Sequence, residues 1–245
     1  MGGESPPIPG EVMCYQYSIL FAFLFSGIVQ AAEAFGPREN RLFFDEKKGN
    51  TFYRIDNSDK KLPWLVQAWI EDASENKTTA LTSIPMVFRV EPSSVFTVRV
   101  VKTGVLPEDR ETLFWAVSNS LPGVVPTKLD NKEGKITAKL SLAYRFKVPL
   151  IYRPTALNNF RQEPEKLEWT YNGNEGLKLY NPTRYIVQLY NITVNGHEFK
   201  GEGVSSIITP MSGKNVSATV KKGTRIKYSV INDNGAIKEY EGIVN

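Results

Sequence analysis

One long segment in which apolar and polar residues alternate constrains the fold of this chain most. From Ile136 to Tyr152 every even position is apolar, whereas the odd positions up to Lys147 are Thr, Lys, Ser, Ala, Arg and Lys. A period of two predicts a β-strand with one apolar face. Strands rarely exceed about ten residues, and Pro149 would remove a ladder hydrogen bond from a central strand. The segment therefore predicts an unusually long edge strand.

Shorter alternating segments recur along the rest of the chain, with turn residues between them. Before the long strand they read RLFFDE, TFYRI, LPWLVQAWIE, PMVFRVE, VFTVRVV and TLFWAVS. After a polar stretch with two prolines at residues 153–165 they read KLEWTY, LKLYN, YIVQLYNITVNG, SSIITP, NVSATV, RIKYSVIND and KEYEGIV. The pattern predicts an all-β protein with two sandwich domains, residues 35–153 and 154–245, each near the length of an immunoglobulin-like domain, about 100 residues.

The N-terminal segment predicts a secretory signal, residues 1–34. Its apolar stretch SILFAFLFSGIVQAAEA is short for a membrane helix and ends in small residues that fit a signal-cleavage site. Cleavage after Ala31 and cleavage after Ala34 fit the pattern equally well. Because no Lys or Arg precedes Arg38, a buried or anchoring N-terminal helix is the alternative.

Composition excludes several kinds of chemistry. The only cysteine, Cys14, lies in the segment that would be removed, so the mature chain would have no disulfide, no cysteine-ligated metal and no cysteine nucleophile. The formal charge of +4 is modest and its lysines are scattered in pairs, which does not suggest a nucleic-acid surface.

Catalytic motifs are absent from the sequence. The single histidine, His197, follows Asn-Gly in a predicted turn and has no second His or Cys as partner. No G-x-S-x-G, P-loop or H-E-x-x-H pattern occurs. We therefore expect no enzyme activity, metal or cofactor. A hydrolase is the least favoured class, and a secreted β-sandwich adhesin or carbohydrate-binding module is the alternative that the composition leaves open.

Several segments, taken together, resemble one known family. They are NRLFFDE (residues 40–46), DKKLPWLVQAWIED (59–72), RVEP (89–92), LPEDRETLFW (106–115), LIYRP (150–154), YNPTRYIV (180–187) and INDNGA (231–236). Their residues and the order in which they occur resemble those of periplasmic pilus-assembly chaperones of the PapD type. The resemblance covers nearly the whole chain after the predicted signal.

The resemblance implies two immunoglobulin-like domains arranged in an L with a cleft between them. It also implies a periplasmic protein that lends a strand to a pilin subunit with an incomplete sheet, caps the subunit and delivers it to an outer-membrane usher. The long strand would then be kept exposed for lending, although such edges are normally an aggregation hazard. The side chains expected to fill the subunit's groove are Leu140, Leu142, Tyr144 and Phe146. The alternative is that they only face their own core. The free protein could also cap its own edge as a homodimer.

The resemblance further implies two sets of charged residues. Arg41 matches the arginine that anchors the subunit's C-terminal carboxylate, a group that a guanidinium can grip with two hydrogen bonds. The family's lysine falls on Pro149 here, so we expect Lys147, on the same side of the strand, to replace it. Glu111, Arg153 and Asp233 match the family's interdomain ion pairs.

Overall fold

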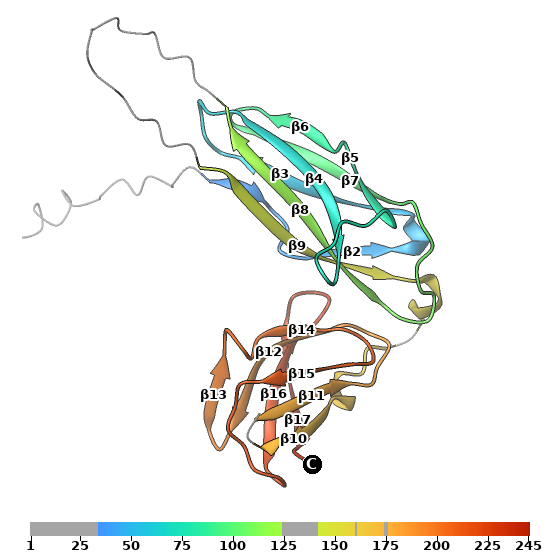
Figure 1. Cartoon of the computed structure of the whole chain (residues 1–245), viewed down its shortest axis with the longest axis vertical. Coiled ribbons are helices and arrows are strands. Elements are labelled where there is room, and N and C mark those ends of the chain that lie inside the picture. Colours follow the sequence, from blue (N-terminus) through green and yellow to red (C-terminus); the bar gives the residue numbers. More distant parts are fainter. Residues whose placement is uncertain (1–33, 124–141, 160, 174–175) are drawn as a thin grey trace, which may run out of the picture. The chain divides into compact units, whose positions relative to one another are not determined.

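The computed structural model describes residues 34–123, 142–159, 161–173 and 176–245 (Figure 1). The predicted signal segment, apart from Ala34, lies outside these residues, and so does Leu140. In the described part of the chain, no helix is long and apolar enough to cross a membrane. Strands make up most of it, joined by turns and by the 3-10 helices η2 (Glu46–Lys48), η3 (Thr155–Leu157) and η4 (Pro164–Lys166).

The N-terminal domain is a sandwich of two sheets. Its strands are β1 (Phe35–Pro37), β2 (Leu42–Asp45), β3 (Asn50–Asn57), β4 (Trp64–Asp72), β5 (Leu81–Ile84), β6 (Val87–Val90), β7 (Ser94–Lys102), β8 (Thr112–Pro122) and β9 (Tyr144–Arg153). One sheet has the order β1-β3-β7-β5 and the other β2-β9-β8-β4-β6. Alternating residues of both sheets meet in one core, which includes Ile55, Val66, Val98 and Leu150.

The C-terminal domain is built in the same way. Its strands are β10 (Glu168–Tyr171), β11 (Leu177–Asn181), β12 (Val187–Val194), β13 (His197–Lys200), β14 (Ser206–Ile208), β15 (Ser212–Val216), β16 (Arg225–Ile231) and β17 (Ile237–Ile243). The sheets are β10-β11-β15 and β13-β12-β16-β17, with β14 also paired to β12. The core centres on Trp169, Leu179, Ile192 and Tyr228. The predicted all-β class with two immunoglobulin-like domains is confirmed, whereas the L-shaped arrangement stays a prediction.

Strand β9 is an edge strand over part of its length. It pairs with β8 throughout, from Tyr144 opposite Ser120 to Tyr152 opposite Thr112. On its other side it pairs in parallel with β2, but only from Leu150 onward. Residues 144–149 of β9 therefore have no strand on their outer side within the described chain. We call residues 144–149 the free edge.

A charged cluster joins η2, β7 and the end of β9 at the base of the N-terminal domain. The Glu46 carboxylate accepts hydrogen bonds from Lys102 Nζ and, at 3.0 Å, from the Thr155 amide. Lys102 Nζ also lies 3.0 Å from the Tyr152 hydroxyl. Hydrogen bonding to Lys102, followed by that to Tyr152 and to the Thr155 amide, lowers the pKa of Glu46 to about 2. Three segments that are distant in sequence are thus joined at one carboxylate.

The Glu46 cluster predicts acid sensitivity. Because the folded-state pKa is depressed, its stabilisation is present above the pKa of the unfolded carboxyl and is lost as the pH falls toward 2. We expect Glu46→Gln to lower the free energy of unfolding at pH 7 by about 2 kcal/mol and to have little effect near pH 2. Urea unfolding across this pH range measures it. Glu163→Gln, which breaks an exposed pair with Lys166, is the control and should change little at any pH. If the loss of unfolding free energy in Glu46→Gln does not become smaller toward low pH, the ionised Glu46 carboxylate is not the source of the stabilisation.

Candidate functional site

The backbone groups of the free edge follow from Pro149. A proline in a sheet occupies a position whose nitrogen faces away from the ladder, and Pro149 lies opposite Trp115 of β8. Because hydrogen-bonding direction alternates along an antiparallel strand, Arg145 and Lys147 then also present their N–H and C=O groups outward. The next residues of this set, Ile151 and Arg153, lie where β2 pairs. The free edge thus offers two residues to an added strand.

The side chains at the even-numbered positions from 142 to 152 divide into an exposed group and a buried group. Val148, Leu150 and Tyr152 are buried in the domain's own core. By contrast, Leu142 is 56% exposed and Tyr144 is 41% exposed. Among the described residues of the segment, own-core packing, the alternative to strand lending, therefore holds for Val148, Leu150 and Tyr152 but not for Leu142 or Tyr144.

Phe146 lies at the transition between these groups. Its ring packs so closely on Gly36 that a Cβ there would lie 3.0 Å from the Phe146 Cζ. It also tilts against Phe35 and Tyr144, and Tyr144 in turn contacts Trp64. An aromatic cluster thus lines the inner side of the free edge. Of the three predicted groove-filling residues that the structure describes, Leu142 and Tyr144 are exposed and Phe146 is partly buried.

Arg41 precedes β2 and contacts the C-terminal domain. Its guanidinium donates to the side-chain oxygen of Gln188 at 3.0 Å and to the backbone carbonyls of Asn232 and Asp233. Burial lowers the pKa of Arg41, although Asp233 and Glu111 oppose this. Within the described residues its three hydrogen-bond partners are neutral oxygens, and no carboxylate there contacts Arg41 to cancel its positive charge.

Lys147 is held quite differently. Its ammonium lies 3.1 Å from a carboxylate oxygen of Glu71 and 2.6 Å from one of Glu75. Arg145 also pairs with Glu71, at 2.6 Å. The structure therefore places the two predicted anchor residues in unlike surroundings: Arg41 among neutral acceptors and Lys147 between two carboxylates. The resemblance to the family gave no indication of Glu71 or Glu75.

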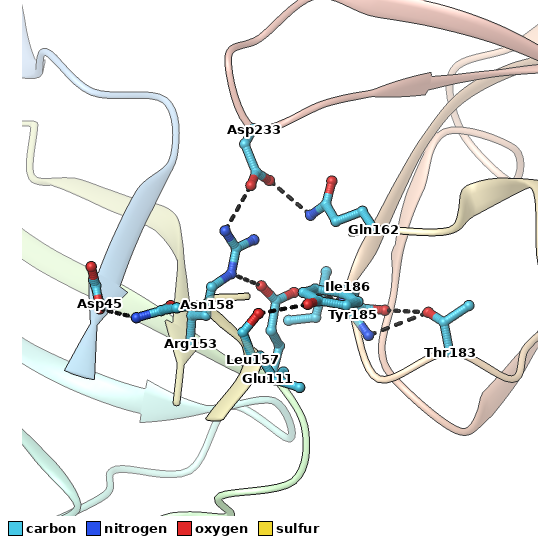
Figure 2. A network of polar contacts seen from close by, with 10 residues as sticks. All are labelled: Asp45, Glu111, Arg153, Leu157, Asn158, Gln162, Thr183, Tyr185, Ile186 and Asp233. Atoms are coloured by element: carbon cyan, nitrogen blue, oxygen red, sulfur yellow. Dashed lines mark hydrogen bonds and ion pairs between the residues drawn. The ribbon is translucent and has the colours of Figure 1, made fainter. Parts of the chain in front are cut away.

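Glu111, Arg153 and Asp233 form one network (Figure 2). Arg153 Nε lies 2.6 Å from Glu111, and Arg153 Nη1 lies 2.8 Å from Asp233. The Glu111 side chain is fully buried and also accepts the Ile186 amide at 2.7 Å. Burial raises the pKa of Glu111, although Arg153 and the Ile186 amide act in the opposite direction. The Arg153 guanidinium also lies over the ring of Tyr185.

The Asn-Pro-Thr motif explains why Tyr185 and Ile186 reach this network. Asn181, fully buried, donates to the Tyr185 carbonyl at 2.8 Å and accepts the Thr183 amide at 3.0 Å. This local bonding shapes the loop that follows β11. Tyr185 then donates its hydroxyl to the Leu157 carbonyl at 2.8 Å, and Ile186 packs with Leu113 and Ile151 in a small apolar cluster. The motif thus presents polar and apolar groups of the C-terminal domain to the end of β9.

No metal centre accompanies these groups. Within the described ranges, the structure contains no set of three or more His, Cys, Asp or Glu side chains arranged to hold a metal ion. His197, at the start of β13, is exposed. The candidate site is therefore the free edge together with Arg41, Lys147 and the network around Arg153.

Both halves of the chain match family models. Residues 34–158 match the model described as "Pili and flagellar-assembly chaperone, PapD N-terminal domain". Residues 162–242 match "Pili assembly chaperone PapD, C-terminal domain". The chain therefore belongs to the PapD family of pilus-assembly chaperones.

Curated relatives cover almost the whole chain. It is 30% identical over 236 residues to the chaperone protein FocC of Escherichia coli, covering 93% of this chain and 98% of FocC. It is 29% identical over 234 residues to the probable fimbrial chaperone LpfB of Escherichia coli O157:H7, covering 94% and 96%.

Solved structures agree with this assignment. The periplasmic chaperone SfaE superposes with a TM-score of 0.68 at 25% identity, covering 86% of this chain and all of SfaE. The SafB chaperone of Salmonella enterica, solved in complex with the SafA pilin, gives 0.69 at 23% identity, covering 87% and 98%, and supports the fold. None of these matches favours the adhesin or the hydrolase alternative.

Proposed function

We propose that this protein is a periplasmic chaperone that binds fimbrial subunits by lending them β9, caps them against self-association and passes them to an outer-membrane usher. The observation that carries the proposal is the free edge, whose outward backbone groups, together with exposed Tyr144 at its start and Leu142 just before it, are of the kind that strand addition needs. The periplasmic location is supported by the predicted N-terminal signal. The role is non-enzymatic, in keeping with the family.

Arg41 and Lys147 are proposed to bind the terminal carboxylate of the subunit. Arg41 stands directly before Leu42, which pairs with Leu150, so it lies beside the part of β9 where the free edge ends. Its donors face neutral oxygens, which a carboxylate would outcompete because charge-assisted hydrogen bonds are stronger. Lys147 lies on the free edge itself. A strand added along this edge would therefore end between two cations.

The Glu111–Arg153–Asp233 network is proposed to hold the two domains in the binding arrangement. It links β9 to the turn after β16 by side chains that are largely shielded from water. A network of this kind contributes orientation more than stability, because desolvation offsets much of the attraction between buried charges. The same free edge would also serve in a homodimer, which sedimentation of the free protein would detect.

Co-expression tests the proposal. The protein and the fimbrial subunit encoded beside it are produced in the periplasm, and soluble complex is recovered for wild type, Arg41→Ala and Lys147→Ala. We expect wild type to protect the subunit and Arg41→Ala to lose the complex by tenfold or more, because a buried charged hydrogen-bond pair is worth about 2–5 kcal/mol. We expect Lys147→Ala to reduce recovery less.

Arg41 also contacts Gln188 and Asn232, so folding of each variant is checked by its urea midpoint. Arg145→Ala, which removes a neighbouring cation, is the matched control and should retain the complex. If both anchor variants retain the complex, the carboxylate assignment is wrong. If wild type protects no fimbrial subunit, the chaperone proposal itself fails.

A further inference from the structure

The two carboxylates that contact Lys147 differ in burial and in the number of their other partners. Glu71 is fixed: its side chain is only 3% exposed, and it accepts Trp69 Nε1–H at 2.8 Å besides pairing with Arg145. Glu75 is 63% exposed, and Lys147 is its only ion-pair partner in the described chain. The Glu71 carboxylate is thus held in place by several contacts, whereas the Glu75 carboxylate can move away from Lys147 into solvent.

The turn between β4 and β5 places Glu75 over Lys147. Asp72 organises this turn: its carboxylate accepts the amides of Ser74 and Asn76, and its carbonyl accepts the Glu75 amide. Glu75 itself has a φ of 65°, a left-handed conformation that residues other than Gly, Asn and Asp seldom adopt. A specific backbone conformation therefore holds this carboxylate at the free edge.

The charge balance around Lys147 depends on Glu75. Lys77 lies over the ring of Trp69 at 4.8 Å, and Arg145 lies over the same ring at 5.5 Å. Lys147 itself lies 5.9 Å from the centre of the Trp115 ring. Arg145 and Lys147 both pair with Glu71, whereas Glu75 pairs with Lys147. Without Glu75, these two cations would share the single carboxylate of Glu71, and the ammonium of Lys147 would be more open to an incoming carboxylate.

We propose that Glu75 is a built-in competitor, which occupies Lys147 in the free protein and is displaced when the terminal carboxylate of a bound strand arrives. The inference rests on the proposed function, because it assumes that Lys147 receives a carboxylate. Glu75 then sets how strongly the site discriminates a strand that ends in a carboxylate from one that does not. It weakens initial capture and leaves Lys147 neutralised when no subunit is present.

The test uses the full-length purified protein and a synthetic peptide of the C-terminal strand of the fimbrial subunit encoded beside it. The peptide is made with a free carboxylate and with a C-terminal amide. Equilibrium binding of both forms is measured for wild type, Glu75→Gln, Lys147→Ala and the double variant. Glu163→Gln, which breaks the exposed pair with Lys166 in the other domain, is the control for a lost surface carboxylate.

We expect Glu75→Gln to tighten binding of the carboxylate peptide by about threefold to tenfold, as fits a partly exposed ion pair. Binding of the amide peptide should not change, and in the Lys147→Ala background the gain should vanish. Glu163→Gln should match wild type with both peptides.

Two results overturn the inference and leave the proposed function standing. In one, wild type prefers the carboxylate peptide but Glu75→Gln does not increase that preference. In the other, the gain persists without Lys147. If wild type binds the two peptides equally or binds neither, the carboxylate anchor of the proposed function fails, and the inference falls with it.

Discussion

Replacing Arg153 by alanine is expected to lower the free energy of unfolding by about 3–5 kcal/mol, because a buried carboxylate would lose its counterion. Glu111 is fully buried, and Arg153 is the cation in contact with it. The same change breaks the link to Asp233. Urea unfolding followed by tryptophan fluorescence measures the loss. Arg161→Ala removes an exposed pair with Glu165 and is the matched control, with an expected loss of at most about 0.5 kcal/mol.

Two further measurements show whether Arg153→Ala is destabilised by the unpaired charge of Glu111 or by the loss of side-chain packing. Glu111→Gln combined with Arg153→Ala should recover most of the deficit, since glutamine can still accept the Ile186 amide but carries no charge. In Arg153→Ala alone, burial keeps the pKa of Glu111 above that of the unfolded chain. Stability of the variant should therefore rise as the pH falls and Glu111 binds a proton. If the unfolding free energy lost in Arg153→Ala does not depend on pH, or if Arg161→Ala loses as much, an unpaired Glu111 carboxylate is not the cause of the loss.

A proline at position 145 is expected to lower subunit binding by about tenfold to a hundredfold, or about 1.4–2.7 kcal/mol. The outward N–H of Arg145 would be lost, and the proline ring would obstruct an added strand, whereas the ladder to β8 would remain. Arg145→Ala loses the same pair with Glu71 but keeps the backbone N–H, so it is the matched control. Recovery of soluble complex from periplasmic co-expression gives the comparison.

The isolated Arg145→Pro protein should unfold at nearly the same urea concentration as Arg145→Ala. Phe146→Pro, in contrast, should destabilise the free protein, because the N–H of Phe146 is expected to bond to β8. If Arg145→Pro supports as much complex as Arg145→Ala, strand lending through the free edge is wrong.

Much of the fold could be predicted from the sequence because its strands alternate clearly. The segments LPWLVQAWIE and TLFWAVS correspond to β4 and β8. Short strands were missed: β1 is only Phe35–Pro37 and contains both Gly and Pro, and β13 lies in a polar segment around His197. The segment NVSATV was predicted as a strand, but β15 ends at Val216. There the pairing with β11 determines the register, and local alternation does not reveal it.

The site was predicted unevenly, for a physical reason. Glu111, Arg153 and Asp233 could be named because family motifs mark them, and the structure brings them within ion-pair distance. Their role in domain orientation, and the anchor roles of Arg41 and Lys147, stay predictions. The sequence does not predict the contacts of Lys147 with Glu71 and Glu75, because they join β9 to the end of β4 and to the turn after it, more than seventy positions earlier in the chain. Such contacts depend on strand order, which side-chain periodicity does not encode.

Backbone amide exchange along β9 tests the central claim most directly. Exchange is measured residue by residue in the free protein and in its complex with the fimbrial subunit. We predict that the amides of Arg145 and Lys147 exchange readily in the free protein and become protected in the complex, while those of β17 are unchanged. Protection confined to other surfaces, with Arg145 and Lys147 still exchanging as in the free protein, would contradict the claim that this protein lends its free edge to the subunit.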